Sequence, residues 1–157
     1  MAFWCKVVLS IIAVEVLGGL GAAITSDQIP GWYASLNAPP GTPPNWLFGP
    51  VWITLYALIG LAFAIVWHRA SPSPEKLMAL VWFGIQFALN LAWTPVFFGL
   101  HQLLIALVVI VALWGSIAVT IVSFSRLQKV AGLLLVPYLL WVRYATYLNA
   151  GYWWLNR

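Results

Sequence analysis

The sequence predicts an all-α protein, an integral membrane bundle of five transmembrane helices that forms a single domain over residues 1–157. Three observations predict this class. Of the 157 residues, 64% are hydrophobic and only 6% are charged, whereas soluble domains carry about 25% charged residues. The apolar residues form five long runs, each near the roughly 20 residues that cross about 30 Å of hydrocarbon. Charged residues, prolines and glycines separate the runs.

The five helices are expected at about 5–25, 46–67, 76–99, 102–125 and 130–154. The last four are separated by "HRASPSPEK" (68–76), "FGLHQ" (98–102) and "SFSRLQK" (123–129). Helices are expected because backbone exposed to lipid must form its hydrogen bonds within its own segment. The first run also resembles a cleaved signal peptide, but Glu15 interrupts its apolar core, and this favours a retained helix.

The predicted loop 26–45, between the first two helices, differs from an ordinary soluble loop. From Gly31 to Trp52 the chain has five prolines and no charged residue. The groups Pro39-Pro40-Gly41 and Pro43-Pro44 exclude a continuous helix or strand there. The composition of residues 31–52 therefore raises the question of what requires a long, aromatic stretch without charged residues.

Positive charges predict the orientation in the membrane. With five spans, the N-terminus and the connections 68–76 and 123–129 share one side, whose basic residues are Lys6, Arg69, Lys76, Arg126 and Lys129. Only Arg157 is basic on the other side. If the protein lies in a plasma membrane, the positive-inside rule predicts a cytoplasmic N-terminus, with the loop 26–45 and the C-terminus outside.

Several function classes receive no support from the sequence. The net charge of +4 comes from scattered residues, so the basic patch of a nucleic-acid-binding protein is missing. Cys5 is the single cysteine, which excludes an intrachain disulfide and a thiolate metal cluster. His68 and His101 stand at loop ends and are interpreted as surface residues. With no nucleophile–base pair evident, we predict no catalytic residue, no metal site and no required cofactor.

The third helix has two faces of different character. Gln86 and Asn90 fall on one stripe, and amides in hydrocarbon usually face the interior of a bundle. Gly84, Ala88 and Ala92 form another stripe at four-residue spacing, which allows a neighbouring helix to approach closely. The partner helix belongs either to a second subunit or to the same chain.

Aromatic residues on the second and fifth helices indicate a pocket. Trp52 and Tyr56 share one face of the second helix, and Trp141 shares a face with Ala145 and Leu148 on the fifth. These tryptophans lie inside their segments rather than at the membrane interface, where tryptophan normally gathers. Aromatic faces opposed across a bundle, with a few amides, describe an apolar pocket for a flat ligand. A simple aromatic core is the alternative.

Two charged residues fall within the hydrophobic runs. Glu15 and Arg143 differ in predicted depth by about 7 Å, at 1.5 Å per helical residue, so an ion pair between them is feasible. Arg143 lies about 200° around its helix from Trp141, which instead favours contact with another helix or with the interface. Glu15 receives no assigned role.

Five segments of the chain resemble the TspO/MBR family, which comprises tryptophan-rich sensory proteins and translocator proteins, including peripheral-type benzodiazepine receptors. They are "LGGLGA" (17–22), "WYASLN-P" (32–39), "PPNWLFGPVWITLY" (43–56), "FALNLAWTPVFFG" (87–99) and "VPYLLWVRYATYLN" (136–149). The resemblance implies five transmembrane helices, a homodimer, and binding of porphyrins such as protoporphyrin IX or haem; the small stripe of the third helix is the dimer interface that we expect from its spacing. Sterols and synthetic translocator-protein ligands are further expected partners.

The resemblance also implies roles for particular residues. The loop after the first helix would be a lid over the open end of the bundle, and its implied residues are Trp32, Tyr33, Leu36, Pro43, Pro44 and Trp46. The implied ligand-binding residues are Trp52, Tyr56, Asn90, Trp93, Trp141, Ala145 and Leu148. A sterol-type pattern is also present as Leu148, Tyr152 and Arg157, although an interfacial tyrosine beside a terminal arginine is the simpler interpretation.

Three functions fit this resemblance. The favoured one is a membrane receptor or sensor that binds tetrapyrroles and acts in their transport or regulation. The second is an enzyme that degrades porphyrin with light or oxygen, in which Trp52 and Trp141 would be the reacting side chains. The third is a porphyrin or sterol transporter, although the chain lacks the internal repeat of many secondary transporters.

Overall fold

The computed structural model describes residues 2–157 and confirms the all-α class. Five helical stretches of this part of the chain are long and apolar enough to cross a bilayer. Most of them combine two elements. In chain order the elements are α1 (Phe3–Gln28), η1 (Ile29–Tyr33), η2 (Asn45–Leu47), α2 (Phe48–Arg69), α3 (Pro74–Thr94), η3 (Pro95–Gly99), α4 (Leu103–Leu127), α5 (Lys129–Leu134) and α6 (Val136–Leu155).

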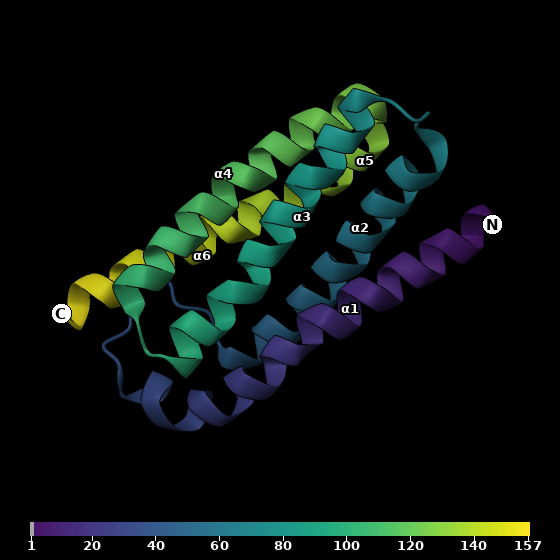
Figure 1. Cartoon of the computed structure of the whole chain (residues 1–157). Helices are drawn as coiled ribbons and strands as arrows, with labels where there is room; N and C mark the ends of the chain where they lie inside the picture. The colour runs from purple at the N-terminus through teal and green to yellow at the C-terminus, as the bar shows by residue number, and fades with distance from the viewer. Residues whose placement is uncertain (1) are drawn as a thin grey trace.

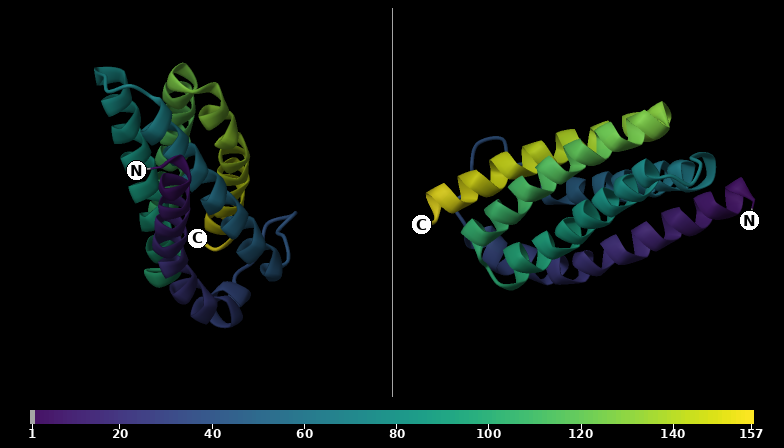
Figure 2. Two further views of the ribbon diagram at one scale, coloured as in Figure 1. Left: turned by 90° about the vertical axis from the view of Figure 1, so that its right-hand side faces the viewer. Right: turned by 45° about the horizontal axis from the view of Figure 1, so that its top comes forward.

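The spans form a closed ring around the bundle axis. Helix α1 packs on α2, α2 on α5 and α6, α6 on α4, α4 on α3, and α3 again on α1. Figures 1 and 2 show the two termini at opposite ends of the bundle, with the connection after η1 at the same end as the C-terminus. The cavity described below therefore lies between helices that are far apart in the sequence.

Two prolines lengthen their spans instead of ending them. Pro30 and Pro95 each stand in the first turn of a five-residue π-helix, η1 and η3. Proline lacks an N–H and its ring clashes with the carbonyl four residues earlier, and the wider π-turn accommodates both defects. In consequence the expected loop 26–45 is too long, because residues 26–33 are helical and only 36–44 lack helical structure.

The connections on the N-terminal side are fixed by polar contacts. Ser73 caps α3, with its hydroxyl accepting a hydrogen bond of 3.1 Å from the Lys76 amide. The Lys76 ammonium donates to the carbonyls of Trp67 and Ala70, at 3.0 and 2.8 Å, at the end of α2. A cation at a helix C-terminus satisfies free carbonyls and complements the helix dipole. The fifth span, expected as one helix over 130–154, is interrupted at Leu135, two residues before Pro137.

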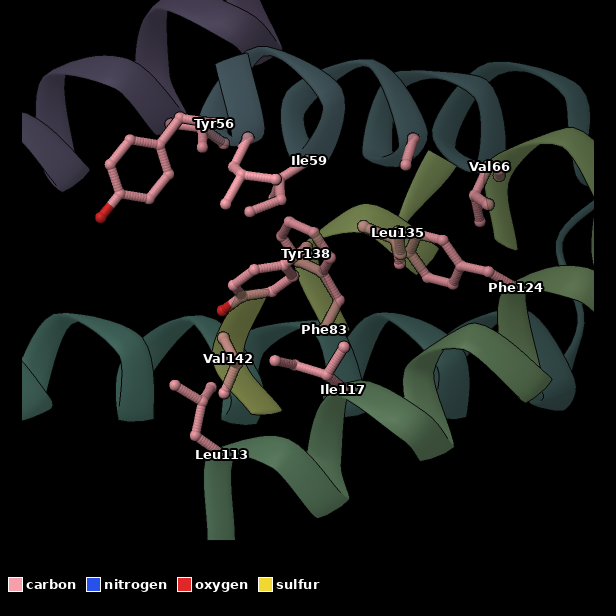
Figure 3. Packing of buried hydrophobic residues seen from close by; sticks show 14 of the residues in the cluster. Tyr56, Ile59, Val66, Phe83, Leu113, Ile117, Phe124, Leu135, Tyr138 and Val142 are labelled. Carbon is pink, nitrogen blue, oxygen red and sulfur yellow. The ribbon is translucent and has the colours of Figure 1, made fainter. Parts of the chain in front are cut away.

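The hydrophobic core fills the half of the bundle away from the lid. Its completely buried members come from the second half of α2, from α3, α4 and α5, and from the start of α6, and include Ile59, Phe124, Leu135 and Tyr138. Figure 3 shows the Tyr138 ring at the centre of this cluster, between side chains of α2 and α4. At the other end a second, smaller buried cluster, which includes Tyr33, Phe97 and Tyr152, lies beside a cavity.

Candidate functional site

A cavity of about 340 Å³ lies between α1, α2, α3 and α6 at the end of the bundle beneath the lid. This volume is within the roughly 300–1,000 Å³ of small-molecule sites. Its walls are mainly apolar and aromatic, and polar atoms come from a few side chains. The lining residues include Glu15, Gly18, Gly19, Ala22, Ser26, Tyr33, Asn45, Phe48, Trp52, Tyr56, Trp93, Thr94, Phe97, Phe98, Trp141, Ala145, Leu148, Asn149 and Tyr152.

Six of the seven residues expected to bind ligand line this cavity. They are Trp52, Tyr56, Trp93, Trp141, Ala145 and Leu148. Trp52 and Trp141 differ from the expected opposed arrangement, because α2 and α6 are neighbours in the ring. Phe48 lies one turn before Trp52 on α2, and its ring centroid is 6.1 Å from that of Trp141. The two tryptophans therefore form adjacent parts of one aromatic wall.

Glycines on α1 form a smooth facing wall. A Cβ atom at Gly18 would lie 2.3 Å from the Tyr56 ring, so that α1 and the ring touch directly. At Gly60, a Cβ would lie 2.7 Å from the Ile11 backbone, which shows how closely α2 approaches α1. Since carbon atoms pack at about 3.5–4.0 Å, a larger residue at Gly60 would separate the two helices, and one at Gly18 would displace the Tyr56 ring. The close approach of α1 to α2 therefore requires glycine, which has no side chain, at both positions.

Asn90 is placed differently from the expectation. It is buried, and it is not among the residues that line the cavity. Its amide oxygen accepts a hydrogen bond of 3.1 Å from the Tyr56 hydroxyl, and its amide nitrogen donates at 3.0 Å to Tyr138. The Tyr138 hydroxyl in turn donates to Gln86, also at 3.0 Å. These hydrogen bonds join α2, α3 and α6 beneath the cavity. Asn90 therefore does not contact the cavity itself but holds the lining residue Tyr56 in position.

The position of Trp93 is fixed by an amide. Its indole N–H donates at 3.0 Å to the Asn149 side-chain oxygen, and the Asn149 nitrogen donates at 2.9 Å to the Leu103 carbonyl. The Trp93 ring also packs on Phe97, with centroids 5.1 Å apart. An aromatic side chain held by both packing and a hydrogen bond is a rigid wall element. Asn149 and Phe97 line the cavity as well, although sequence reasoning did not place them there.

The connection after η1 is attached to α6 by hydrogen bonds. Asn37 and Asn156 form a reciprocal pair, in which the Asn37 amide donates at 2.9 Å and its carbonyl accepts at 3.0 Å. The Tyr147 hydroxyl donates at 2.9 Å to the Pro40 carbonyl, and the Tyr144 hydroxyl donates to the carbonyl of Gly41. These contacts hold residues 36–44 against the C-terminal end of the bundle.

Close packing supplements the hydrogen bonds at the lid. The Pro39 ring packs so tightly on Gly151 that a Cβ atom there would lie 2.5 Å from the Pro39 Cβ. Tyr33 is buried, lines the cavity, and accepts a hydrogen bond of 2.8 Å from the Tyr152 hydroxyl. Tyr152, with Leu148, faces this interior cluster. The sterol-type pattern of Leu148, Tyr152 and Arg157 therefore does not form one lipid-facing surface.

The remaining expected lid residues divide into two groups. The Trp32 ring stacks on His101 with centroids 4.1 Å apart, and a nitrogen of His101 lies 2.9 Å from the Gln28 amide oxygen. Leu36 packs against the buried cluster beneath the lid. Trp46 lies in η2 with 71% of its surface exposed, and Pro43 and Pro44 are not among the lining residues. Trp46 thus follows the interfacial interpretation of tryptophan.

Sequence reasoning left Glu15 without a role, and it lines the cavity on the same α1 face as Gly19, Ala22 and Ser26. The spacing of these four residues is the helical i, i+4, i+7, i+11 pattern, a signal already present in the sequence. Arg143, by contrast, is exposed on α6. Glu15 therefore faces the cavity and Arg143 the outer surface of the bundle, so the two do not form an ion pair.

The small stripe of α3 lies on the outer surface of the bundle. Gly84 and Ala88 are exposed and Ala92 is half-buried. Among residues 2–157, and apart from the adjoining residues and backbone of α3 itself, no atom comes within 4 Å of the position that a Cβ of Gly84 would occupy. Gly84 and Ala88 therefore remain outside the packing within the chain, whereas Ala92 is partly covered.

Comparison with known proteins agrees with this arrangement. The model of the TspO/MBR family matches residues 10–155. The chain belongs to this family. It is 42% identical to a tryptophan-rich protein TspO of Archaeoglobus fulgidus over 96% of this chain and 97% of that protein. It is 42% identical to the human translocator protein (85% and 82% covered) and 40% identical to a tryptophan-rich sensory protein of Cereibacter sphaeroides (82% and 77%).

Family membership and the five apolar spans together make this TspO/MBR member a multi-pass integral membrane protein in contact with the lipid bilayer. The match to the family model extends over the cavity walls, the connection 36–44 and the small stripe, which all fall within residues 10–155.

Proposed function

We propose that this protein is a membrane receptor or sensor whose cavity binds a flat tetrapyrrole, with protoporphyrin IX as the expected ligand and haem as a related one. The observation that carries the proposal is the aromatic wall formed by Trp52 and Trp141 beside the glycine-rich face of α1. Stacking on an aromatic side chain contributes about 1–3 kcal/mol per base in nucleic-acid complexes. A macrocycle lying against two indoles gains a comparable contribution.

The lid supports the same proposal. Its backbone is held to α6 by the Asn37–Asn156 pair and by Tyr147, and its prolines restrict the unfolded chain. An uncharged, ordered lid closes an apolar cavity without removing a charged group from water. A receptor for hydrophobic ligands needs such closure. The names of two relatives, "sensory protein" and "translocator protein", suit a ligand sensor or carrier.

Binding is tested by titrating the purified protein with protoporphyrin IX and following the quenching of tryptophan fluorescence. We expect saturation at micromolar or lower ligand concentration. Quenching that never saturates, and that equals the quenching seen with empty nanodiscs plus free tryptophan, would refute the proposal. Sterols and synthetic translocator-protein ligands are tested as competitors of the bound porphyrin.

A porphyrin-degrading enzyme is the second candidate, because two oxidisable indoles line the cavity. The variants Trp52→Phe and Trp141→Phe keep a flat apolar ring and remove the indole. A receptor would lose less than about tenfold in affinity, or about 1.4 kcal/mol, in either variant. An enzyme would lose light-dependent decay of the porphyrin absorbance while it retained binding. Decay at the wild-type rate in both variants excludes the indoles as reacting groups.

A porphyrin or sterol transporter is the third candidate. It differs from a receptor in that ligand must leave the cavity on the other side of the membrane. Proteoliposomes loaded with an internal porphyrin acceptor distinguish the two, since a receptor binds porphyrin without raising its rate of entry. We favour the receptor because the packed core around Tyr138 fills the bundle on the N-terminal side of the cavity.

The assembly and orientation form part of the proposal. A homodimer is expected through Gly84, Ala88 and Ala92, because this stripe is free on the outside of α3 and small residues allow close helix approach. The N-terminus is expected in the cytoplasm and the lid outside, if the protein lies in a plasma membrane. Labelling of the exposed Cys5 with an impermeant maleimide in whole and permeabilised cells tests the orientation.

A further inference from the structure

One charged side chain stands out in the cavity. Of the described residues that line it, only Glu15 carries a charged group. Glu15 lies in the middle of α1 (Phe3–Gln28), too far from either helix end to act as a cap. A carboxylate at such a depth is costly in a bilayer and is usually found where it has a function.

Glu15 marks the end of the cavity that is farthest from the lid. On α1 the lining residues extend from Glu15 to Ser26, a distance of about 16 Å at 1.5 Å per residue. Glu15 is three residues before Gly18, which touches the ring of Tyr56, and Tyr56 is the lining residue of α2 that is farthest from the lid. Glu15 and Tyr56 therefore lie together at the deep end. Ser26 and Asn45, at the lid end, are polar but uncharged.

Basic residues of the same chain lie elsewhere. Arg143 is exposed on α6. The Lys6 ammonium lies 4.7 Å above the Trp67 ring at the opposite end of the bundle. Glu15 is also too short, and too far from the membrane surface, to extend its carboxylate into water as a long basic side chain does. A charged or hydrogen-bonding partner for Glu15 is therefore expected from a molecule in the cavity.

We propose that Glu15 determines specificity at the deep end of the cavity, where it binds a protonated nitrogen or N–H group of the ligand and excludes a carboxylate. The inference rests on the proposed function of the cavity as a ligand site. Apolar walls lower the local dielectric constant, so that a charge acts more strongly there than in water. A porphyrin with two carboxylates should therefore bind with these groups toward Ser26 and Asn45 at the lid end, and with its apolar edge toward Glu15.

A series of three ligands with one flat ring tests this inference. 9-Anthracenemethylamine, 9-anthracenemethanol and 9-anthracenecarboxylate differ at a single group, which is cationic, neutral or anionic at neutral pH. Binding is measured in nanodiscs of phosphatidylcholine by energy transfer from the protein's tryptophans, with empty nanodiscs as the partition control. We expect wild-type protein to bind the amine about tenfold more tightly than the alcohol, as for a hydrogen bond to a charged group, and the carboxylate most weakly.

The variant Glu15→Gln keeps the size of the side chain and removes its charge. We expect it to bind the alcohol as wild type does, and to lose the preference for the amine. Glu75→Gln is the matched control, because Glu75 is exposed at the start of α3 outside the cavity, and it should retain the wild-type order.

Equal affinity of the wild type for the amine and the alcohol would overturn the inference. So would a preference that persists in Glu15→Gln, or a loss of alcohol binding in that variant, because the latter indicates a structural role. The proposed function fails separately. If the protein discriminates among the anthracenes but shows no saturable binding of protoporphyrin IX, the role of Glu15 stands and the tetrapyrrole assignment is wrong.

Discussion

The contact between Pro39 and Gly151 makes the lid sensitive to a single methyl group. In Gly151→Ala the new Cβ would lie 2.5 Å from the Pro39 Cβ and 2.8 Å from its Cγ. Carbon atoms pack at about 3.5–4.0 Å, so the two segments must separate by about 1 Å. Pro39 has little freedom to adapt, because its ring fixes the backbone φ angle. The lid segment as a whole must therefore move away from α6.

The free-energy cost of this displacement can be estimated. Overpacking by one methyl group costs about 1–3 kcal/mol, and the lid escapes the cost by opening. A change of 1 kcal/mol lowers the ratio of closed to open lid about fivefold. The reciprocal hydrogen bonds between Asn37 and Asn156, at 2.9 and 3.0 Å, would then break in a larger fraction of molecules.

Hydrogen–deuterium exchange of residues 34–44, read by mass spectrometry, measures the population of open lid. We expect faster exchange in Gly151→Ala and faster release of bound porphyrin in stopped-flow dissociation. Gly115→Ala is the control, since within residues 2–157 a Cβ at Gly115 would meet no atom within 4 Å beyond the adjoining residues and backbone of α4 itself. Unchanged exchange in Gly151→Ala, or the same increase in Gly115→Ala, would refute the reasoning.

Three further predictions concern the rest of the molecule. Tyr138→Phe should lower the melting temperature in detergent, because the buried Asn90 amide then lacks its acceptor, at a cost of about 1–3 kcal/mol; an unchanged melting temperature contradicts this. Ala88→Leu should raise the monomer fraction in analytical ultracentrifugation, and an unchanged dimer would place the interface elsewhere. His101→Ala should increase exchange in η1 by removing the ring that stacks on Trp32, and equal protection would show that the stacking contributes nothing.

The fold and much of the cavity wall could be predicted from the sequence. Hydropathy locates the spans because the bilayer accepts only segments that satisfy their own backbone. Helical spacing places Trp52 with Tyr56, and Trp141 with Ala145 and Leu148, because side chains four residues apart share a face. The structure places all five of these residues on the cavity.

Other features depend on how deeply a side chain is buried and on which helices pack beside it, and the spacing of residues along one helix determines neither. Asn90 shares its face with Gln86, yet the spacing does not show that the ring of Tyr56 lies between Asn90 and the cavity. The π-turns at Pro30 and Pro95 were unexpected, because proline normally ends a helix. Trp52 and Trp141 are adjacent because α2 and α6 are neighbours in the ring of helices. The order of helices is a tertiary property that the spacing within one helix does not determine.

The central claim is that the cavity between α1, α2, α3 and α6 is the ligand site, and filling that cavity tests it most directly. Ala145 lines the cavity, so Ala145→Phe places a ring in the space that the ligand would occupy. Val119→Phe adds the same ring to the exposed outer surface of α4 as a control. In a titration with protoporphyrin IX, we predict saturable binding for the wild type and for Val119→Phe, and a loss of about tenfold or more in Ala145→Phe. Equal binding by all three proteins would contradict the account.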